Sequence, residues 1–257
     1  MEKPVALTQA VIEQNLRLLG LERGMAVEVH SSLSRFGRVE GGAATVIAAL
    51  MNVVGEEGAL VMPAFALTLP LPLSDEDKAR GILAKVRFLP PDTRERTGMG
   101  IIADTFRRCP GVITGPGFHR VCAWGRDAQR HSQGYQYLLD SSGWTLLLGV
   151  DIHRCTSMHY AEGKVGLPEE VRAFFDTNKE ILRDYPAEQW YVETVTPPED
   201  AWGKIQAEAD RRGFIRHRRI GAAECMFFRA CDVVGLYEQA LRTDPWGLYG
   251  IRKREAS

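Results

Sequence analysis

Cysteine is sparse in this sequence, and its spacing excludes the usual crosslinked and zinc-bound folds. The five cysteines are scattered and odd in number, and no two of them stand in C-x-x-C spacing. Neither a disulfide framework nor a structural zinc site is therefore expected. We expect reduced thiols, most of them buried as small hydrophobic side chains. At 45% hydrophobic and 25% charged residues, the chain matches an ordinary globular protein that is large enough to bury its own core.

Long apolar runs and an excess of charge are also missing. The longest apolar runs are short, such as residues 144–150, whereas a bilayer-spanning helix needs ~20 residues. The first residues carry no basic region followed by an apolar stretch, which predicts no secretory signal and a cytoplasmic location. Lys and Arg number 32 against 33 for Asp and Glu, giving a net charge of -1. We therefore expect neither a nucleic-acid nor a membrane partner.

Several well-known catalytic and binding motifs are absent. There is no G-x-S-x-G elbow, which argues against the serine nucleophile of an α/β-hydrolase. The chain has neither a Walker Lys-Ser/Thr pair nor a G-x-G-x-x-G fingerprint, so a P-loop and a dinucleotide site of the usual kind are unsupported. No H-E-x-x-H motif or Cys/His cluster is present, and no metal is expected.

The first third of the chain reads as strand, glycine-bearing loop, helix and strand. Thr8 is a suitable N-cap for a first helix that runs to residue 18. A strand is expected at residues 26–30, a helix at 43–54 and a second strand at 59–62. This order is the βαβ pattern of an α/β protein.

Beyond residue 63, the pattern is less regular. Residues 64–91 carry four prolines and a charged patch, and they predict a long loop with one helix at 75–86. No repeat and no linker composition is visible, so we expect one domain over residues 1–257, with 64–91 as an insertion on the substrate side. The remaining expected elements are helices at 98–108, 196–212 and 233–241, and strands at 144–150 and 222–229.

The most informative segment follows the buried strand that ends near Val150. Thr156 is a plausible N-cap, and His159 and Glu162 then lie three residues apart, on one face of the expected helix. A carboxylate beside an imidazole fixes its tautomer and leaves the other ring nitrogen as a base. The segment also lies beyond the carboxyl end of a strand, where open α/β sheets place ligands. A capped helix with a surface His–Glu pair is the alternative.

A second candidate site is the loop at residues 30–42. Its serines offer hydroxyl groups, its glycines allow close approach of the backbone, and the expected helix start at Ala43 can receive a phosphate. An ordinary polar turn explains the local sequence equally well. His30, at a strand end, is typical of a hydrogen-bonded core histidine. His119 is typical of a solvated loop, and Cys155 near His159 leaves a Cys–His nucleophile open beside a buried thiol.

Taken in order, segments of the chain resemble the aminoglycoside 3-N-acetyltransferase family, the antibiotic acetyltransferases outside the GNAT fold. The strongest match is Thr156-Ser-Met-His-Tyr-Ala-Glu162. The matching segments span about residues 30–232, and the ordered set is more specific than any one of its members. The other matches are His30-Ser-Ser-Leu-Ser34, Gly41-Gly-Ala-Ala-Thr-Val-Ile47, Gly58-Ala-Leu-Val-Met-Pro63, Met99-Gly100, Ala123-Trp-Gly125, Leu147-Leu-Gly149 and Arg219-Ile-Gly221.

The resemblance implies a single domain with a central mixed sheet flanked by helices. It also implies transfer from acetyl-CoA to the 3-amino group of an aminoglycoside, conferring resistance. His159 would be the general base, and Glu162 would orient it or hold the cationic amine, with Asp151 also on the acceptor side. The amine would attack the thioester directly, and amides near Ser32 and Leu33 would stabilise the oxyanion. The residues expected to bind acetyl-CoA are His30, Ser31, Ser32, Leu33, Ser34, Gly41, Gly42, Thr45 and Met99.

Two segments depart from the family pattern, and both are expected to shape the acceptor pocket. They are residues 113–120 and the insertion at 64–91. Two other functions therefore stay open: acetylation of a different small amine in biosynthesis, and a CoA-binding module without catalysis. The resemblance also leaves a homodimer open.

Overall fold

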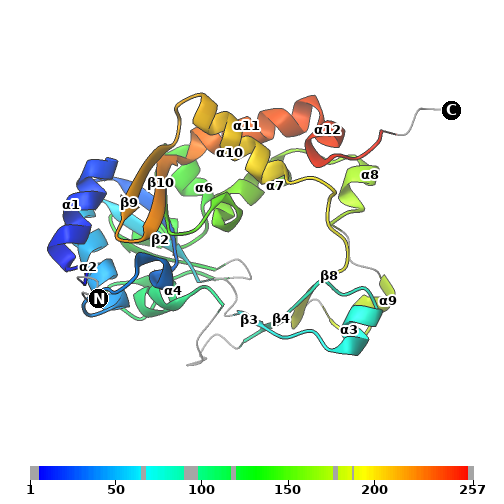
Figure 1. Ribbon diagram of the computed structural model, residues 1–257, viewed down its shortest axis with the longest axis horizontal. Coiled ribbons are helices and arrows are strands. Elements are labelled where there is room, and N and C mark those ends of the chain that lie inside the picture. The colour runs from blue at the N-terminus through cyan, green and yellow to red at the C-terminus, as the bar shows by residue number, and fades with distance from the viewer. Residues whose placement is uncertain are drawn as a thin grey trace, which may run out of the picture.

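The computed structural model describes residues 6–64, 68–89, 98–116, 120–175, 179–186 and 188–253. Its main body is a seven-stranded mixed sheet between two layers of helices (Figure 1). This confirms the expected mixed α/β architecture. Within the described ranges, no helix combines the length and the apolar character that crossing a membrane requires.

Three parallel strands form the centre of the main sheet. β1 (Ala26–Ser31) lies between β2 (Ala59–Pro63) and β7 (Trp144–Leu148), and all three run in the same direction. Antiparallel strands complete both sides, in the order β5-β6-β2-β1-β7-β10-β9. The outer strands are β5 (Ile113–Thr114), β6 (Val121–Gly125), β9 (Arg216–Ile220) and β10 (Ala223–Arg229).

Both faces of the central strands are buried, and successive side chains alternate between two hydrophobic clusters. On β7, Leu146 and Leu148 join one cluster and Leu147 joins the other. The first cluster is covered by α1 (Gln9–Leu19), α2 (Ala43–Val54) and α4 (Ile101–Phe106).

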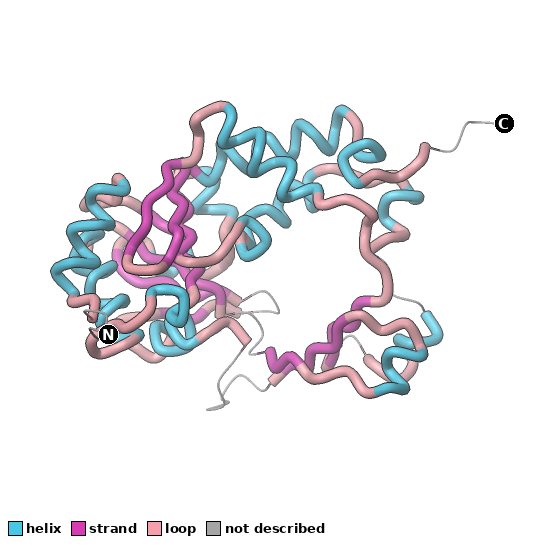
Figure 2. The backbone as a smooth tube through the Cα atoms, viewed as in Figure 1, coloured by secondary structure: helices cyan, strands magenta, loops and turns pink. Residues whose placement is uncertain are grey.

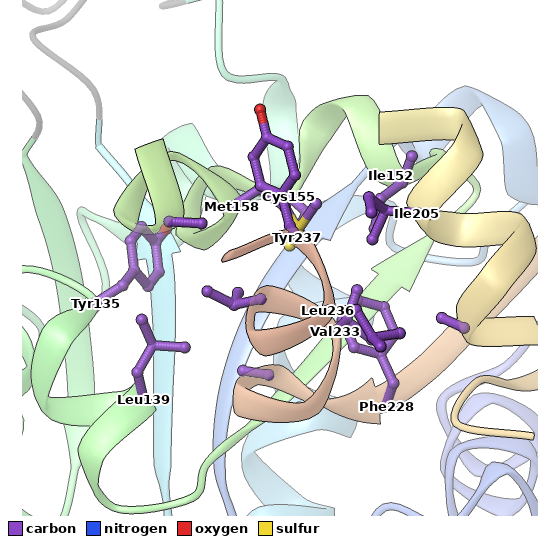
Figure 3. Packing of buried hydrophobic residues seen from close by; sticks show 14 of the residues in the cluster. Tyr135, Leu139, Ile152, Cys155, Met158, Ile205, Phe228, Val233, Leu236 and Tyr237 are labelled. Atoms are coloured by element: carbon purple, nitrogen blue, oxygen red, sulfur yellow. The ribbon is translucent and has the colours of Figure 1, made fainter. Parts of the chain in front are cut away.

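The opposite cluster packs against the helices of the second half of the chain. Figure 3 shows part of it, with Tyr135, Cys155, Phe228 and Tyr237 among the labelled side chains. The helices are α5 (Ala128–His131), α6 (Gln136–Asp140), α7 (His159–Lys164), α8 (Glu169–Arg172), α10 (Ala201–Arg211), α11 (Ala230–Thr243) and α12 (Pro245–Tyr249).

The predictions for the first third are confirmed: Thr8 caps α1 through its side chain, and α2 has the expected bounds. Two later helices are shorter than expected. Of the helix expected over 98–108, only α4 is helical in the structure. α10 begins at Ala201, and its cap is Asp200, whose carboxylate accepts a hydrogen bond from the N–H of Gly203. The expected start at residue 196 is therefore wrong.

Residues 64–91 differ from the expected loop and helix. Four residues separate α3 (Asp75–Ala79) from β4 (Ala84–Phe88). One of them, Gly81, has a φ of +78°, a left-handed conformation that favours glycine. β4 pairs with β3 (Thr68–Pro70) and with β8 (Trp190–Glu193). This second sheet, with α9 (Lys179–Leu182), lies apart from the main sheet in Figure 2.

The second sheet is held by a buried ion pair in addition to a small core of Ile82, Ile181 and Val192. The carboxylate of Asp77 on α3 accepts from the ammonium of Lys85 at 2.6 Å and from the hydroxyl of Tyr185 at 2.9 Å. The Lys85 hydrogen bond is the main cause that holds the pKa of Asp77 below its usual range.

We expect acid to loosen this second sheet before the main sheet. Asp77 has a lowered pKa in the folded chain, so its contribution to stability is present above the ordinary aspartate pKa of ~4 and is lost as the pH falls below it. Between pH 7 and pH 3, protection from hydrogen exchange, measured relative to the intrinsic rate at each pH, should fall in β4 and β8 before it falls in β7. In Asp77→Asn, the exchange of β4 and β8 should be faster already at pH 7. Unchanged exchange there in the variant would contradict the ion pair's role.

Candidate active site

His159 and Glu162 form a hydrogen-bonded pair at the start of α7. The Nδ1 atom of His159 lies 2.8 Å from Oε2 of Glu162, and the two side chains are 56% and 24% exposed. Burial raises the pKa of Glu162, but hydrogen bonds from His159 and other partners outweigh it and lower the pKa overall. The carboxylate is therefore ionised at neutral pH and accepts a hydrogen bond from the Nδ1–H group. This tautomer leaves the lone pair of Nε2 free to act as a base.

Three aromatic side chains hold the pair from α10, α11 and α12. The Tyr237 hydroxyl donates to Oε1 of Glu162 at 2.7 Å, and Tyr249 hydrogen-bonds the Tyr237 hydroxyl in turn. The Trp202 side chain also hydrogen-bonds Glu162, and its ring lies 4.8 Å from the His159 ring, centroid to centroid. Both carboxylate oxygens are thus engaged, so the imidazole has a fixed partner.

The local start of α7 differs from the expected cap. Thr156 is not an N-cap: it opens a single 3₁₀ turn, η4 (Thr156–Met158), which continues directly into α7 at His159. Cys155 stands at the cap position of η4 and makes no side-chain capping hydrogen bond. A tight turn beyond the end of β7 therefore positions His159.

The second candidate site lies at the end of β1, the strand next to β7. Ser31 ends β1, and the 3₁₀ turn η1 (Leu33–Phe36) follows it. Two glycines with positive φ, Gly41 and Gly42, lead into α2, whose first turn has no side-chain cap. Among the described residues no side chain takes up the N–H groups of that turn, and α2 has 12 residues to supply a dipole.

The structure brings the expected acetyl-CoA residues close together. A Cβ built on Gly42 would lie 3.9 Å from the Leu33 side chain, and a Cβ built on Gly100, next to Met99, would lie 3.6 Å from the carbonyl oxygen of Ser31. The hydroxyls of Ser32 and Ser34 are 3.2 Å apart. A Cβ built on Gly41 would likewise lie against the Thr45 hydroxyl. Three chain segments thus meet around the end of β1.

His30 sits below that surface and connects the two candidate sites. It is only 5% exposed, and its Nε2 lies 2.7 Å from Oε1 of the buried Glu28. The backbone nitrogen of Thr156 approaches the same Nε2 at 3.3 Å. The expectation of a hydrogen-bonded core histidine is met, and this core histidine touches the turn that carries His159.

Asp151 lies beside a second histidine on the exposed side of the site. Its Oδ1 caps the 3₁₀ turn η3 (Ile152–Arg154) and lies 3.1 Å from Nδ1 of His153, while Nε2 of His153 lies 2.8 Å from Oδ1 of Asp200. Burial lowers the pKa of His153, but the hydrogen bonds with Asp200 and Asp151 outweigh it and raise the pKa overall. Trp202 stands between this histidine and His159.

Cys155, the other nucleophile candidate raised by the sequence, does not join the site. Cys155 is fully buried, and burial raises the pKa of its thiol well above the ordinary value, so it is no nucleophile at neutral pH. His131 is buried in α5, and burial lowers its pKa to about 4. His119 lies outside the described residues. All five cysteines are free, and three of them are buried, as expected.

Sequence reasoning missed the residues that support the site from elsewhere in the chain. Tyr237, Trp202 and Asp200 come from α10 and α11, 40 or more positions after His159, and no spacing rule connects them to it. Glu28 did carry a signal: a charged residue between two valines in a buried strand is rare unless it is paired.

Comparison with known proteins gives one consistent result. The family model described as aminoglycoside 3-N-acetyltransferase matches residues 29–242. The chain is 30% identical to the SPbeta prophage-derived aminoglycoside N(3')-acetyltransferase-like protein YokD of Bacillus subtilis, over 90% of this chain and 91% of that protein. It is 26% identical to an aminoglycoside N(3)-acetyltransferase III of Salmonella sp, over 88% of each chain.

A solved structure shares the fold at lower identity. The complex of AAC-IIIb with CoASH aligns with a TM-score of 0.69 at 20% identity, covering 97% of this chain and all of that one.

Proposed function

The chain belongs to the aminoglycoside 3-N-acetyltransferase family, a family of acyltransferases, and on that premise we propose that it acetylates the 3-amino group of an aminoglycoside, using acetyl-CoA. The observation that carries the proposal is the His159–Glu162 pair, whose geometry leaves Nε2 free as a base. The pair lies next to a loop cluster suited to a phosphate-bearing cosubstrate, at the ends of two adjacent parallel strands.

Acetyl-CoA binds, in this proposal, over the end of β1 and the start of α2. All the expected residues except His30 are at least partly exposed there, from Ser31 through Thr45 and at Met99. The open N–H groups at the start of α2 suit a phosphate. The CoASH complex of AAC-IIIb, which shares the fold, supports the choice of cosubstrate. His30 contributes from below, by shaping the loop.

The reaction follows from the free Nε2 of His159. As the acceptor amine attacks the thioester carbonyl, Nε2 takes the proton from the amine nitrogen, and the charge of Glu162 stabilises the imidazolium that forms. The tetrahedral intermediate then expels the CoA thiolate, and the proton held by His159 can return to the leaving sulfur. No acetyl-enzyme forms. The products are the acetylated amine and free CoA, which together account for all atoms of the two substrates.

One of the two amides expected to stabilise the oxyanion is already engaged. The N–H of Ser32 donates to the carbonyl of Leu148 at 2.9 Å, extending the pairing of β1 with β7. Leu33 opens η1, and its N–H has no acceptor in the described part of the chain. We therefore assign the oxyanion contact to Leu33 and not to Ser32.

The acceptor faces an acidic side of the site. Glu162, Asp151 and Asp200 place carboxylates around His159, which suits a substrate carrying several ammonium groups. The second sheet lies on the same side in this proposal. Burial, and then the charges of Glu193 and Glu162, raise the pKa of Tyr191 on β8, so Glu162 is within electrostatic reach of that strand.

A thiol-release assay tests the proposal. The protein is incubated with acetyl-CoA and a panel of aminoglycosides, amino sugars and amino acids, and free CoA is measured. We expect release with aminoglycosides and a product acetylated at the 3-amino group by mass spectrometry and NMR. Release only with a small neutral amine would move the function to biosynthesis, and binding of CoA without release would leave a binding module.

Titration of His153 should change the affinity for the acceptor. Its raised pKa keeps the ring charged up to a higher pH than in an ordinary histidine, and the charged ring neutralises Asp151 and Asp200. As the pH rises through this pKa, the carboxylates lose their partner and become available to a substrate ammonium. His153→Gln should therefore lower the acceptor KM about two- to fivefold near pH 6, since exposed ion pairs are worth this much.

The ratio of wild-type to variant KM should approach one above the pKa of His153. KM values for one aminoglycoside, measured from pH 6 to pH 9 in both proteins, give this ratio, with the KM for acetyl-CoA as the control. A ratio that stays constant with pH would refute the competition.

A further inference from the structure

A charged residue is fully buried at the centre of the main sheet. Glu28 of β1 has no exposed surface, and it lies between Val27 and Val29, which are equally buried. Burial raises its pKa, but hydrogen bonds from His30 and Ser157 outweigh burial and lower it, so the carboxylate is ionised. A buried ionised group costs stability unless it is well paired, and apolar replacements of such pairs are often as stable. Packing alone does not account for a glutamate here.

The two oxygens of Glu28 have different partners. Oε2 accepts from the hydroxyl of Thr145, the residue opposite Glu28 on β7, at 3.1 Å. Oε1 lies 2.7 Å from Nε2 of His30 and accepts from the backbone N–H of Ser157 at 3.1 Å. One oxygen therefore ties two strands together, and the other holds the turn η4.

The contacts on η4 fall on consecutive residues. The Ser157 N–H meets Glu28, and the Thr156 nitrogen lies 3.3 Å from the His30 ring. These are the first N–H groups of the 3₁₀ turn, which have no partner within the turn itself. Two residues later, the chain reaches His159. On the other side, His30 precedes Ser31 and the loop cluster assigned to acetyl-CoA.

We propose that Glu28, together with His30, is a positioning residue for the reaction: it holds η4 against the end of β1 and so fixes His159 relative to the acetyl-CoA loop. The inference rests on the proposed function, and it assigns Glu28 no contact with substrate. A base displaced by about 1 Å costs about 10²-fold in rate. A buried charge that anchors both loops prevents such a displacement.

The matched pair Glu28→Gln and Thr145→Val separates positioning from stability. Thr145→Val removes the hydrogen bond to Oε2 and a contact with the Cys155 thiol, and it leaves the Ser157–Glu28 contact on η4, whereas Glu28→Gln removes the charge that η4 faces. We expect Glu28→Gln to lower kcat 10- to 100-fold, with the KM for acetyl-CoA changed less than threefold. Thr145→Val should lower the Tm comparably and change kcat less than twofold. Equal losses of kcat in both variants, or none in Glu28→Gln, would overturn the proposal.

A second variant covers the case in which Glu28→Gln does not fold. The double variant Glu28→Met/His30→Leu replaces the buried pair with apolar side chains, which preserves stability in many proteins. We expect its Tm to stay near that of the wild type while kcat falls 10- to 100-fold. A wild-type kcat in this variant would overturn the proposal.

Hydrogen exchange keeps this test independent of the proposed function. The amides of Ser157 and Met158 should exchange faster in Glu28→Gln than in Thr145→Val, whatever the substrate proves to be. If the wild-type protein acetylates no amine, the function fails while the exchange result still decides whether Glu28 holds η4. Equal protection of these amides in both variants would refute the anchoring itself.

Discussion

His159→Ala is expected to lower kcat by ~10²–10⁴, the range of general-base catalysis, and to leave the affinity for acetyl-CoA nearly unchanged. The reason is geometric. Glu162 takes up Nδ1 of the ring at 2.8 Å, and no described residue hydrogen-bonds Nε2, so the ring nitrogen left free to act as a base is lost with the ring. Initial rates at saturating acetyl-CoA, together with CoA affinity from calorimetry, measure both effects.

A matched surface pair provides the control. His217 on β9 is hydrogen-bonded to Asp210 at 2.6 Å and is 51% exposed, close to the 56% exposure of His159. His217→Ala should leave kcat unchanged if the chemistry belongs to His159 alone. A His159→Ala variant that keeps near-wild-type turnover would restore the alternative of a surface His–Glu pair without a catalytic role.

The parts of the fold that could be predicted are those specified by local signals. α2 begins after two glycines and ends at Gly55, and its bounds agree with the sequence prediction at both ends. β7 is a continuous apolar run buried on both faces. β4 was missed although its own sequence alternates apolar and charged residues, which is the pattern of a strand. What the sequence could not show is its partner β8, about 100 residues later in the chain.

The same division applies to the site. The spacing of His159 and Glu162 fixes their mutual contact, since i and i+3 share a helix face. The spacing does not show what keeps Glu162 in place, because Tyr237, Tyr249 and Trp202 reach it from helices that only the tertiary fold brings near. Thr156 was misassigned for a related reason. The N–H of Ser157, which a cap would satisfy, is held by Glu28 from the sheet, and the Thr156 nitrogen faces the His30 ring at 3.3 Å.

Glu162→Gln is the second substitution with a large expected effect. The pKa of Glu162 is lowered by the hydrogen bond from His159, against the effect of burial, so the native side chain is a carboxylate that can only accept. An amide can turn its NH₂ group toward Nδ1, and the ring then carries its proton on Nε2, where it cannot act as a base. It also offers no charge to the imidazolium. We expect kcat to fall by at least ~10², as for the orienting carboxylates of other catalytic histidines.

The variant should also raise the acceptor KM, because it removes one of the carboxylates that attract the substrate ammonium groups. The KM for acetyl-CoA should not change, and the salt dependence of the acceptor KM should become no steeper, since exposed charges act over only ~8 Å at physiological ionic strength.

Tyr237→Phe is the graded comparison for Glu162→Gln. It removes one hydrogen bond to Oε1 and keeps the charge and the contact with His159. A hydrogen bond to a charged group is worth ~1.5–3 kcal/mol, but only part of this reaches the rate while the charge and the contact with His159 remain, so kcat should fall less than in Glu162→Gln. If both variants lost activity equally, placement of the carboxylate would matter more than its charge. If neither did, His159 would act without Glu162, and the pair would not be the catalytic unit.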